Sequence, residues 1–329
     1  MINFRTAFRL LKTNRHEFLN SVFTELNMRG WLTWISDPVF LRICYRRMLG
    51  RRLNLKNPQS FNEKLQWLKL YNRKPEYTTM VDKYAVKAYV SGIIGEEYII
   101  PTIGIWNKPE EIEWDSLPNQ FVLKTTHGGG NTGVVICNDK STFNKEEAVR
   151  KLNKSLSMDL YDIWREWPYK NVKKRVIAEK YIAPDSENIN DSKKSEIFIK
   201  QLDLCDYKFF CFNGKCEYFK IDFDRFTSHH ANYFNKNCEL MRFGEIACPP
   251  DFDKHLTIPS NINHMIELAE QVASKIGSPF VRVDFYSTMG HIYFGEITFY
   301  PAAGFGKFIP EDCDLKWGYL LELPDKSNC

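Results

Sequence analysis

Short runs of apolar residues, bounded by glycine, proline or asparagine, predict a series of β-strands in this chain. The strongest turn signal is Asn213-Gly214, because this dipeptide favours the two-residue turn of a β-hairpin. The runs predicted as strands are residues 98–100, 121–124, 134–137, 175–182, 206–212, 216–221, 279–286 and 292–299. Neighbouring runs can pair as hairpins, which is the pattern of an α+β protein.

Apolar residues at helical spacing predict helices between these strands. Ser60 and Glu63 have the spacing of a capping box, so a helix is expected to begin at residue 61. Further helices are expected at residues 82–90, 146–156, 159–169 and 262–276, and within residues 1–57. Residues 107–119, 184–195 and 227–256 show no clear period and are expected to be irregular.

The composition is that of a globular protein without a strong charge bias. Apolar residues make up 43% of the 329 positions, enough for one large domain or two modest ones. The net charge of +4 is too small to indicate a nucleic acid partner, and none is expected. The nine cysteines lack paired spacing, so we expect reduced thiols and no zinc site at Cys205, Cys211 or Cys216. No secretory h-region and no long apolar run is present, so the expected location is the cytoplasm.

Basic residues gather in the first 57 positions of the chain. One group is Arg5, Arg9, Lys12 and Arg15, and a second is Arg42, Arg46, Arg47, Arg51 and Arg52. Two interpretations remain open from the sequence. The charges form solvated faces of helices, or they dock to an anionic membrane surface, such as the inner face of a membrane, or to an acidic polymer.

A glycine-rich loop between two predicted strands is the first candidate site. Lys124 ends one strand, Gly128 to Gly130 follow, and a second strand resumes at Val134. Glycines let backbone N–H groups approach an anion closely, so a lysine with such a loop suits a nucleotide polyphosphate. The loop is neither a P-loop nor a dinucleotide fingerprint, because no helix opens directly after it. A hairpin without a ligand is the alternative interpretation.

The last predicted hairpin carries the second candidate site. Asp284 and Arg282 share one face of its first strand, and Glu296 and Thr298 share a face of its second. If the loop is residues 289–291, Asp284 lies opposite Glu296 and Arg282 opposite Thr298. Two carboxylates beside an arginine suit Mg²⁺ ions that bridge phosphates, and the arginine can stabilise a transferring phosphoryl group. A cross-strand salt bridge on a solvated face is the alternative.

Taken in order, these stretches resemble the ATP-grasp superfamily, and most closely the TupA-like ATP-grasp proteins, named from teichuronopeptide biosynthesis. The matching stretches are F-N-E-K-L at 61–65, D-K-Y-A-V at 82–86, F-V-L-K with H-G at 121–128, A-E-K-Y-I at 178–182, D-Y-K-F-F-C-F-N-G-K at 206–215, and V-R-V-D-F with G-E-I-T-F-Y-P at 281–301. The resemblance covers about residues 55 to 323. It implies an α+β ATP-grasp fold in which two α+β lobes clasp ATP, with a helical amino-terminal region.

The resemblance also implies a division of the chain. Residues 1–57 would form the basic helical region, and residues 58–118 a reduced segment before the ATP-grasp lobes. Residues 119–183 would form the small lobe with its glycine-rich lid, and residues 184–329 the large lobe with the magnesium site.

The roles that the resemblance implies fall into three groups. ATP would be bound by Lys124, His127, Gly128, Gly129, Gly130, Glu179, Lys180, Ile182 and Asp206. Lys124 would contact the α- and β-phosphates. Glu179, Lys180 and Ile182 would hold adenine, with Lys180 also reaching phosphate, and Asp206 would contact the ribose. Arg282 and Lys208 would act on the transferring group or the acyl substrate. Mg²⁺ would be held by Asp284 and Glu296, with Thr298 where many relatives have asparagine.

The superfamily's chemistry implies an ATP-dependent carboxylate–amine ligase that works through an acyl phosphate. The substrates implied are a uronic acid or similar carboxylate of a surface polysaccharide (capsule, O-antigen or teichuronopeptide) and an amine. His127, His229 and His230 either assist amine deprotonation or are loop histidines without a catalytic role. Two alternatives are a glycosyltransferase that uses Asp222-Phe223-Asp224 to bind a metal–sugar nucleotide, and a non-catalytic nucleotide-binding scaffold.

Overall fold

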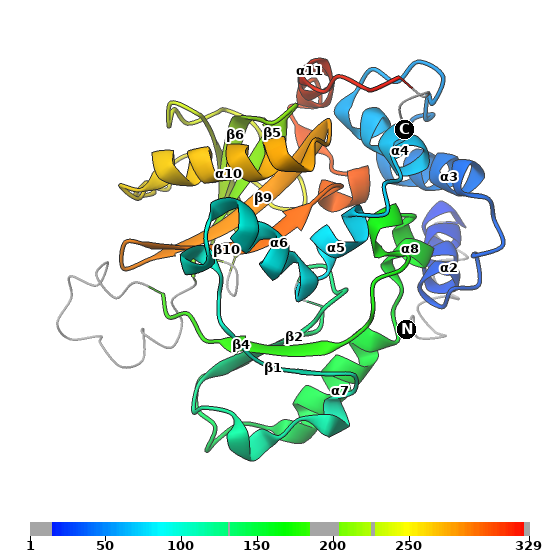
Figure 1. The fold of residues 1–329 in the computed structure, drawn as a ribbon. Coiled ribbons are helices and arrows are strands. Elements are labelled where there is room, and N and C mark those ends of the chain that lie inside the picture. Colours follow the sequence, from blue (N-terminus) through cyan, green and yellow to red (C-terminus); the bar gives the residue numbers. More distant parts are fainter. Residues whose placement is uncertain (1–14, 131, 185–203, 225–227, 326–329) are drawn as a thin grey trace.

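The computed structural model describes residues 15–130, 132–184, 204–224 and 228–325, and shows a four-stranded and a five-stranded antiparallel sheet, a further two-stranded pair, and helices around them (Figure 1). The α-helices are α2 (Arg15–Met28), α3 (Asp37–Leu49), α4 (Phe61–Tyr71), α5 (Tyr77–Val81), α6 (Ala85–Ile94), α7 (Lys145–Leu156), α8 (Leu160–Trp164), α10 (Ile262–Ile276) and α11 (Cys313–Leu320). The strands are β1 (Thr102–Trp106), β2 (Phe121–Thr125), β3 (Val134–Cys137), β4 (Val176–Lys180), β5 (Asp206–Phe212), β6 (Lys215–Phe223), β7 (His230–Asn235), β8 (Gly244–Glu245), β9 (Phe280–Thr288), β10 (His291–Thr298) and β11 (Phe308–Ile309). Short 3₁₀ turns are η1 (Glu96–Tyr98), η2 (Pro109–Glu111), η3 (Trp114–Ser116), η4 (Trp167–Tyr169) and η5 (Pro301–Gly304).

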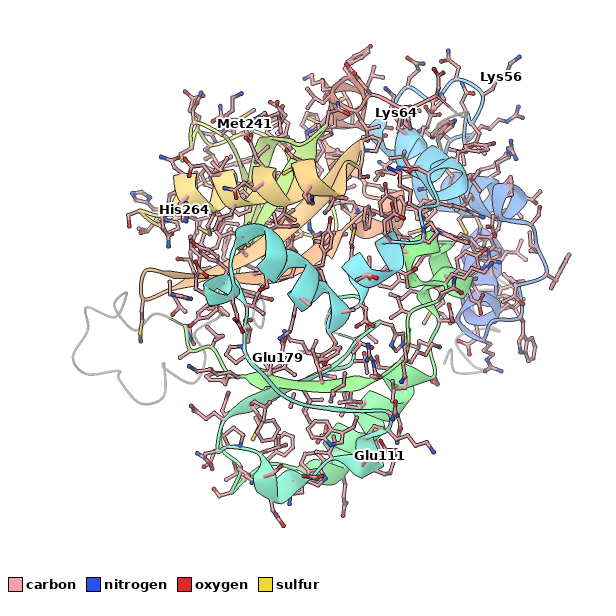
Figure 2. All side chains as sticks on the ribbon, in the orientation of Figure 1. Lys56, Lys64, Glu111, Glu179, Met241 and His264 are labelled. Atoms are coloured by element: carbon pink, nitrogen blue, oxygen red, sulfur yellow. The ribbon has the colours of Figure 1, made fainter. Side chains whose placement is uncertain are left out.

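The small sheet has the order β1-β4-β2-β3, and α7 packs on one of its faces. Phe121, Leu123 and Leu152 form a separate apolar cluster there. The other face turns toward α6, and Figure 2 shows Glu179 of β4 on this side. Strand β1 comes from residues 58–118, so the small sheet extends beyond the segment 119–183 that the sequence assigns to the small lobe.

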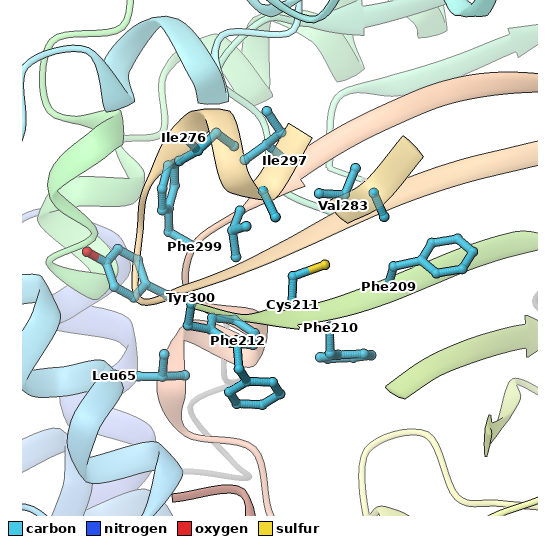
Figure 3. Packing of buried hydrophobic residues seen from close by; sticks show 14 of the residues in the cluster. Leu65, Phe209, Phe210, Cys211, Phe212, Ile276, Val283, Ile297, Phe299 and Tyr300 are labelled. Carbon is cyan, nitrogen blue, oxygen red and sulfur yellow. The ribbon is translucent and has the colours of Figure 1, made fainter. Parts of the chain in front are cut away.

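The large sheet has the order β10-β9-β5-β6-β7. One of its faces is apolar, and the other is apolar at one end and polar over the rest. One face packs against α10, whose Ile276 is drawn in Figure 3 with Val283 and Cys211 of the sheet. On the opposite face Phe210 and Phe212 pack against Trp317 of α11, at ring-centroid distances of 5.0 and 5.7 Å. The rest of that face is polar, because the same strand continues with Asp206 and Lys208.

Several local predictions are confirmed by the structure. Ser60 and Glu63 form the predicted capping box at the start of α4. Asn213 and Gly214 form the predicted turn, with φ angles of 49° and 81°. Helices α7 and α10 match their predicted spans to within one residue.

Other local predictions are wrong. The strand expected at residues 98–100 lies at β1 instead, because the chain forms η1 first and pairing with β4 begins only where Pro101 accepts a hydrogen bond from Lys180 N at 3.0 Å. Helix α6 begins at Ala85, not at residue 82, and continues past Gly92 to Ile94.

The segment 227–256, expected to be irregular, contains β7, the edge strand of the large sheet, and β8. The buried Asn232 breaks the apolar pattern of β7, and its amide is satisfied by hydrogen bonds to the backbone of Asp251 at 2.6 and 3.0 Å.

The last hairpin has the predicted strand register, but its turn and its strand geometry differ from the prediction. Its turn has two residues, Met289 and Gly290, with φ angles of 50° and 74°, and not the three residues 289–291 that were predicted. A bulge at Gly295 then shifts the pairing by one residue, so that Asp284 lies opposite Glu296. The pairing of Arg282 with Thr298 follows from the same shift.

Candidate active site

A row of polar side chains crosses the open face of the large sheet. The strand registers place Glu296, Asp284, Lys208, Lys220 and Tyr233 side by side, one from each strand from β10 to β7. Asp284 is only 1% exposed and Lys208 6%, so these charges are held away from bulk water. Buried charges are costly unless they are paired, and a row of them indicates a binding face.

Arg282 joins the two carboxylates at one end of this row. Its Nη2 lies 2.6 Å from Asp284 Oδ2 and 3.1 Å from Glu296 Oε1, and its Nε donates to Asp284 Oδ1 at 2.7 Å. The two carboxylates therefore converge on one group, as they would on one cation. The donor set is all oxygen, with the Thr298 hydroxyl 3.4 Å from Glu296 Oε1, and hard oxygen ligands are those that Mg²⁺ prefers. These residues fit the predicted magnesium site.

The charges at this end influence each other's protonation. Burial raises the pKa of Glu296, but the cations of Lys83 and Arg282 lower it more, so its pKa falls below the ordinary range. Burial raises the pKa of Asp284 despite the opposing effects of Arg282 and Lys208. Burial alone would lower the pKa of Arg282, but Asp284 raises it above its ordinary value, so the guanidinium keeps its charge.

Lys208 occupies the middle of the row. Its ammonium pairs with Asp206, lies 3.1 Å from Asp284 Oδ2 and 3.6 Å from Asp222 Oδ2. Burial would lower the pKa of Lys208, but Asp206 and Asp284 raise it more, so the side chain remains cationic. Lys208 thus bridges the position expected for the ribose and the position expected for the metal.

A second cluster lies on the small sheet. Glu179, 4% exposed, forms ion pairs with Lys87 of α6 and with Lys124 of β2, the latter at 2.6 Å between Nζ and Oε2. Burial raises the pKa of Glu179, but these two ammonium groups lower it more, so the carboxylate stays ionised. Two cations around one buried carboxylate form a polar group able to face a nucleotide.

The structure separates the three residues expected to hold adenine. Glu179 is buried beside the two lysines, whereas its neighbour Lys180 is exposed, and Ile182 is buried. Successive residues of a strand point to opposite faces, so Lys180 cannot share the setting of Glu179. Its contact with phosphate stays a prediction that this arrangement does not favour.

Of the three consecutive glycines in the loop, Gly128 has no room for a side chain. A Cβ on Gly128 would lie 2.6 Å from Thr125 Oγ1 and 2.8 Å from the Thr132 carbonyl oxygen, and Gly130 has a φ of +57°. Gly129, in contrast, has only a contact at 3.4 Å. The loop's closure over phosphates stays a prediction.

His127 anchors the start of this loop. It is 3% exposed, and its Nε2 lies 3.2 Å from the carbonyl oxygen of Ser155 in α7. Burial, with a further effect from Lys174, lowers its pKa below the ordinary value, so the ring is neutral near pH 7. This inward position indicates a structural role and does not favour contact with ATP or an amine.

Two lysines that the sequence analysis left without a role join the two clusters. Lys83 donates from its backbone N to Thr126 O at 2.9 Å, just after β2, and its Nζ lies 2.9 Å from Glu296 Oε2. Lys87, in the first turn of α6, contacts Glu179. Lys83 lies within D-K-Y-A-V and Lys87 directly after it, so the lysines in and beside this motif are the signal that could have identified them.

The D-x-D motif does not form one acidic group. Asp222 is buried, with Lys220 Nζ 3.5 Å from its Oδ1, whereas Asp224 is partly exposed and pairs with Lys254 at 3.2 Å. Ligand atoms of Asp222, His229 and Cys248 lie within 4.8 Å of one another, a possible setting for a metal ion. The ammonium groups of Lys208 and Lys220 beside Asp222 already balance its charge, so we assign no metal to this group.

Comparison with known families now adds to this geometry. The family model described as TupA-like ATPgrasp matches residues 63–322, which is most of the chain. This chain belongs to the TupA-like ATP-grasp family. The resemblance inferred from the ordered motifs is thereby confirmed, and with it the ATP-grasp fold: the TupA-like protein holds its Lys124–Glu179 cluster on one α+β lobe and its Asp284–Glu296 pair on the other.

Solved structures similar to this TupA-like protein include several ligases. D-alanine–D-alanine ligase from Bacillus anthracis is 18% identical with a TM-score of 0.37, over 67% of this chain and 57% of that one. The Helicobacter pylori enzyme is 13% identical with a TM-score of 0.40, over 81% and 70%. An ADP complex of N5-carboxyaminoimidazole ribonucleotide synthetase is 13% identical with a TM-score of 0.42, over 72% and 50%. The chain thus spans little more than half of the first ligase, and TM-scores this low carry no inference about its activity.

No curated protein matches the chain significantly. Among the helices of the described residues, none is both long and apolar enough to cross a membrane.

Proposed function

We propose that this TupA-like protein is an ATP-dependent ligase that activates a carboxylate as an acyl phosphate and joins it to an amine. The observation that carries the proposal is the contact made by Lys83. This residue touches both the end of β2, beside the glycine-rich loop, and Glu296, so the predicted phosphate loop and the predicted magnesium pair adjoin. A nucleotide polyphosphate with its metal would occupy such a junction.

The side chains suggest a division of labour. Lys124 and Lys87 would neutralise phosphate oxygens, with Glu179 orienting both ammonium groups. When bound, Mg²⁺ held by Asp284 and Glu296 would supply a Lewis acid that withdraws charge from the γ-phosphate. Arg282 keeps its charge and would stabilise the phosphoryl group during transfer to the carboxylate.

The acyl phosphate must then react with an amine and be kept from water, which would hydrolyse it back to the carboxylate. Attack by the amine on the acyl carbon forms the amide bond and expels phosphate, so each cycle converts ATP to ADP and phosphate. Lys208, buried and cationic, would hold the carboxylate near Arg282. We infer that the carboxylate belongs to a uronic acid or similar sugar acid of a surface polysaccharide, because the chain belongs to the TupA-like proteins, a family named from teichuronopeptide biosynthesis.

The test measures whether an oxygen atom of the carboxylate is transferred to the released phosphate. Uronic acids labelled with ¹⁸O would be incubated with MgATP and a panel of amines, and the released phosphate analysed by mass spectrometry. The proposal expects ADP, and phosphate that carries one labelled oxygen. Release of AMP, or phosphate without label in a reaction that forms the amide, would refute the acyl phosphate.

A glycosyltransferase is the less favoured alternative. It would consume a sugar nucleotide and rely on Asp222 and Asp224, whose different environments do not support a shared metal. It also leaves the Lys124–Glu179 cluster without a role. Turnover of a sugar nucleotide in the absence of ATP would favour the glycosyltransferase over the ligase.

A further inference from the structure

The connection between α2 and α3 exposes an unusual amount of apolar surface. Trp34 is 81% exposed and Trp31 62%, and Met28 and Val39 beside them are nearly half exposed. We call residues 28–39 the α2–α3 corner. All four exposed side chains lie within twelve consecutive positions, at the end of α2, in the connection and at the start of α3. Exposed tryptophans are uncommon on a soluble face without a partner.

The corner stands on a rigid base. Asp37 at the start of α3 pairs with Arg73 and with Arg165, which is 1% exposed, and Arg165 also donates to the Leu32 carbonyl at 3.0 Å. Phe40 packs under the corner against Phe23 of α2 at a ring distance of 6.0 Å. The polar and apolar contacts therefore face inward, and the tryptophans remain on the outer side. Figure 1 shows α2 and α3 stacked beside α8 on the flank of the molecule.

Basic residues outnumber acidic ones in the part of the chain that contains the corner. Residues 15–57 contain eight lysines and arginines against three acidic residues, a net charge of +5, whereas the whole chain carries +4. On α3, Val39, Arg42 and Arg46 are all exposed, and their spacing places them on one outer stripe that begins at the corner. Arg29 lies with its guanidinium carbon 5.7 Å from the Trp31 ring centre.

We propose that the α2–α3 corner docks the protein on an anionic lipid bilayer. Tryptophan side chains prefer the boundary between headgroups and acyl chains, and arginines beside them attract anionic headgroups. An acidic polymer would match the arginines but would leave the tryptophans and Val39 in water. The combination of both on one surface therefore favours a membrane surface. The inference does not depend on the proposed reaction.

The test is sedimentation of the full chain with vesicles. Vesicles of phosphatidylcholine mixed with phosphatidylglycerol would be compared with phosphatidylcholine alone. We expect binding to the anionic vesicles only, weakened when salt rises from about 0.1 M to about 1 M, since this shortens the Debye length to about 3 Å. Replacing Trp31 and Trp34 by serine should lower the partition coefficient about tenfold or more, and R42Q and R46Q about fivefold each.

The matched control uses apolar side chains exposed elsewhere. Tyr319 is 69% exposed and Ile246 57%, so the variant with both replaced by serine removes a similar apolar surface and should bind vesicles like the wild type. Absence of binding to anionic vesicles would overturn the proposal. So would binding that depends on the arginines but not on the tryptophans, which would indicate an acidic polymer site. A dimer in ultracentrifugation that the tryptophan substitutions dissociate would also overturn it, because a second copy would then cover the corner.

Discussion

Replacement of Asp284 by asparagine is expected to lower ATP turnover by about 10³-fold without unfolding the protein. The carboxylate is the shared partner of Arg282 and Lys208, which lie 2.6 and 3.1 Å from its Oδ2. An amide at this position would supply no negative charge to bind a cation. It would also leave the Arg282 guanidinium and the Lys208 ammonium without the carboxylate that lies between them. The loss should therefore appear in kcat and in the dependence on Mg²⁺.

The measurement is ADP release in the presence of carboxylate and amine, with circular dichroism to check folding. D224N is the matched control, because Asp224 is partly exposed and pairs with the exposed Lys254, and it should keep wild-type turnover. A D284N protein that retains more than about a tenth of the activity would remove Asp284 from the catalytic assignment.

Replacement of Lys69 by methionine is expected to destabilise the fold by about 3–5 kcal/mol. Lys69 is fully buried in α4 and donates to the carbonyl oxygens of Trp164 at 2.8 Å and Ala303 at 2.7 Å. It is also the main cation acting on Glu166, whose pKa burial raises to about 7. Methionine would leave two buried acceptors unpaired and one carboxylate without its countercharge.

The sign of the pH dependence follows from Glu166. Its pKa is higher in the folded protein than in the unfolded chain, so the fold binds a proton that the unfolded chain releases. Without Lys69 that pKa rises further, so the stability of the variant should fall as pH increases above about 4.5 and should continue to fall past pH 7. The cost of K69M should therefore be smaller at pH 5 than at pH 8, as measured by urea unfolding.

Two further variants make this prediction specific. Adding E166Q to K69M should restore part of the lost stability, because it removes the uncompensated charge. K316M changes an exposed lysine of α11 in a surface pair and should leave the free energy of unfolding close to the wild-type value. If K69M lowers the free energy of unfolding equally at pH 5 and pH 8, Lys69 does not affect the pKa of Glu166.

The magnesium pair could be predicted from the sequence because it depends on local geometry. Alternation along one strand and a short turn place Asp284 near Glu296 in any tight hairpin. The two-residue turn and the bulge at Gly295 could not be predicted individually. The turn is one residue shorter than expected and the bulge adds one residue, so the pairing of Asp284 with Glu296 is the same with both features or with neither. Likewise, Asn213-Gly214 identifies its hairpin because only a few residues tolerate two positive φ angles in succession.

The parts that escaped prediction depend on distant contacts. Lys83 reaches Glu296, more than 200 positions away, and nothing in a local pattern specifies that pair. Strand β7 was missed because Asn232 is polar and yet buried, its amide satisfied by a loop nineteen residues on. His127 looked like a loop histidine available to a ligand, and only the packing of α7 shows that it points inward.

The most direct test of the central claim is calorimetric titration of the protein with MgATP, with ATP free of magnesium and with UDP-sugars. The account predicts magnesium-dependent binding of ATP that is weakened about 100-fold in K124A, because this variant removes one of two cations held by Glu179. K151A, which changes an exposed lysine of α7, should bind like the wild type. Absence of ATP binding together with clear binding of a UDP-sugar would contradict the account.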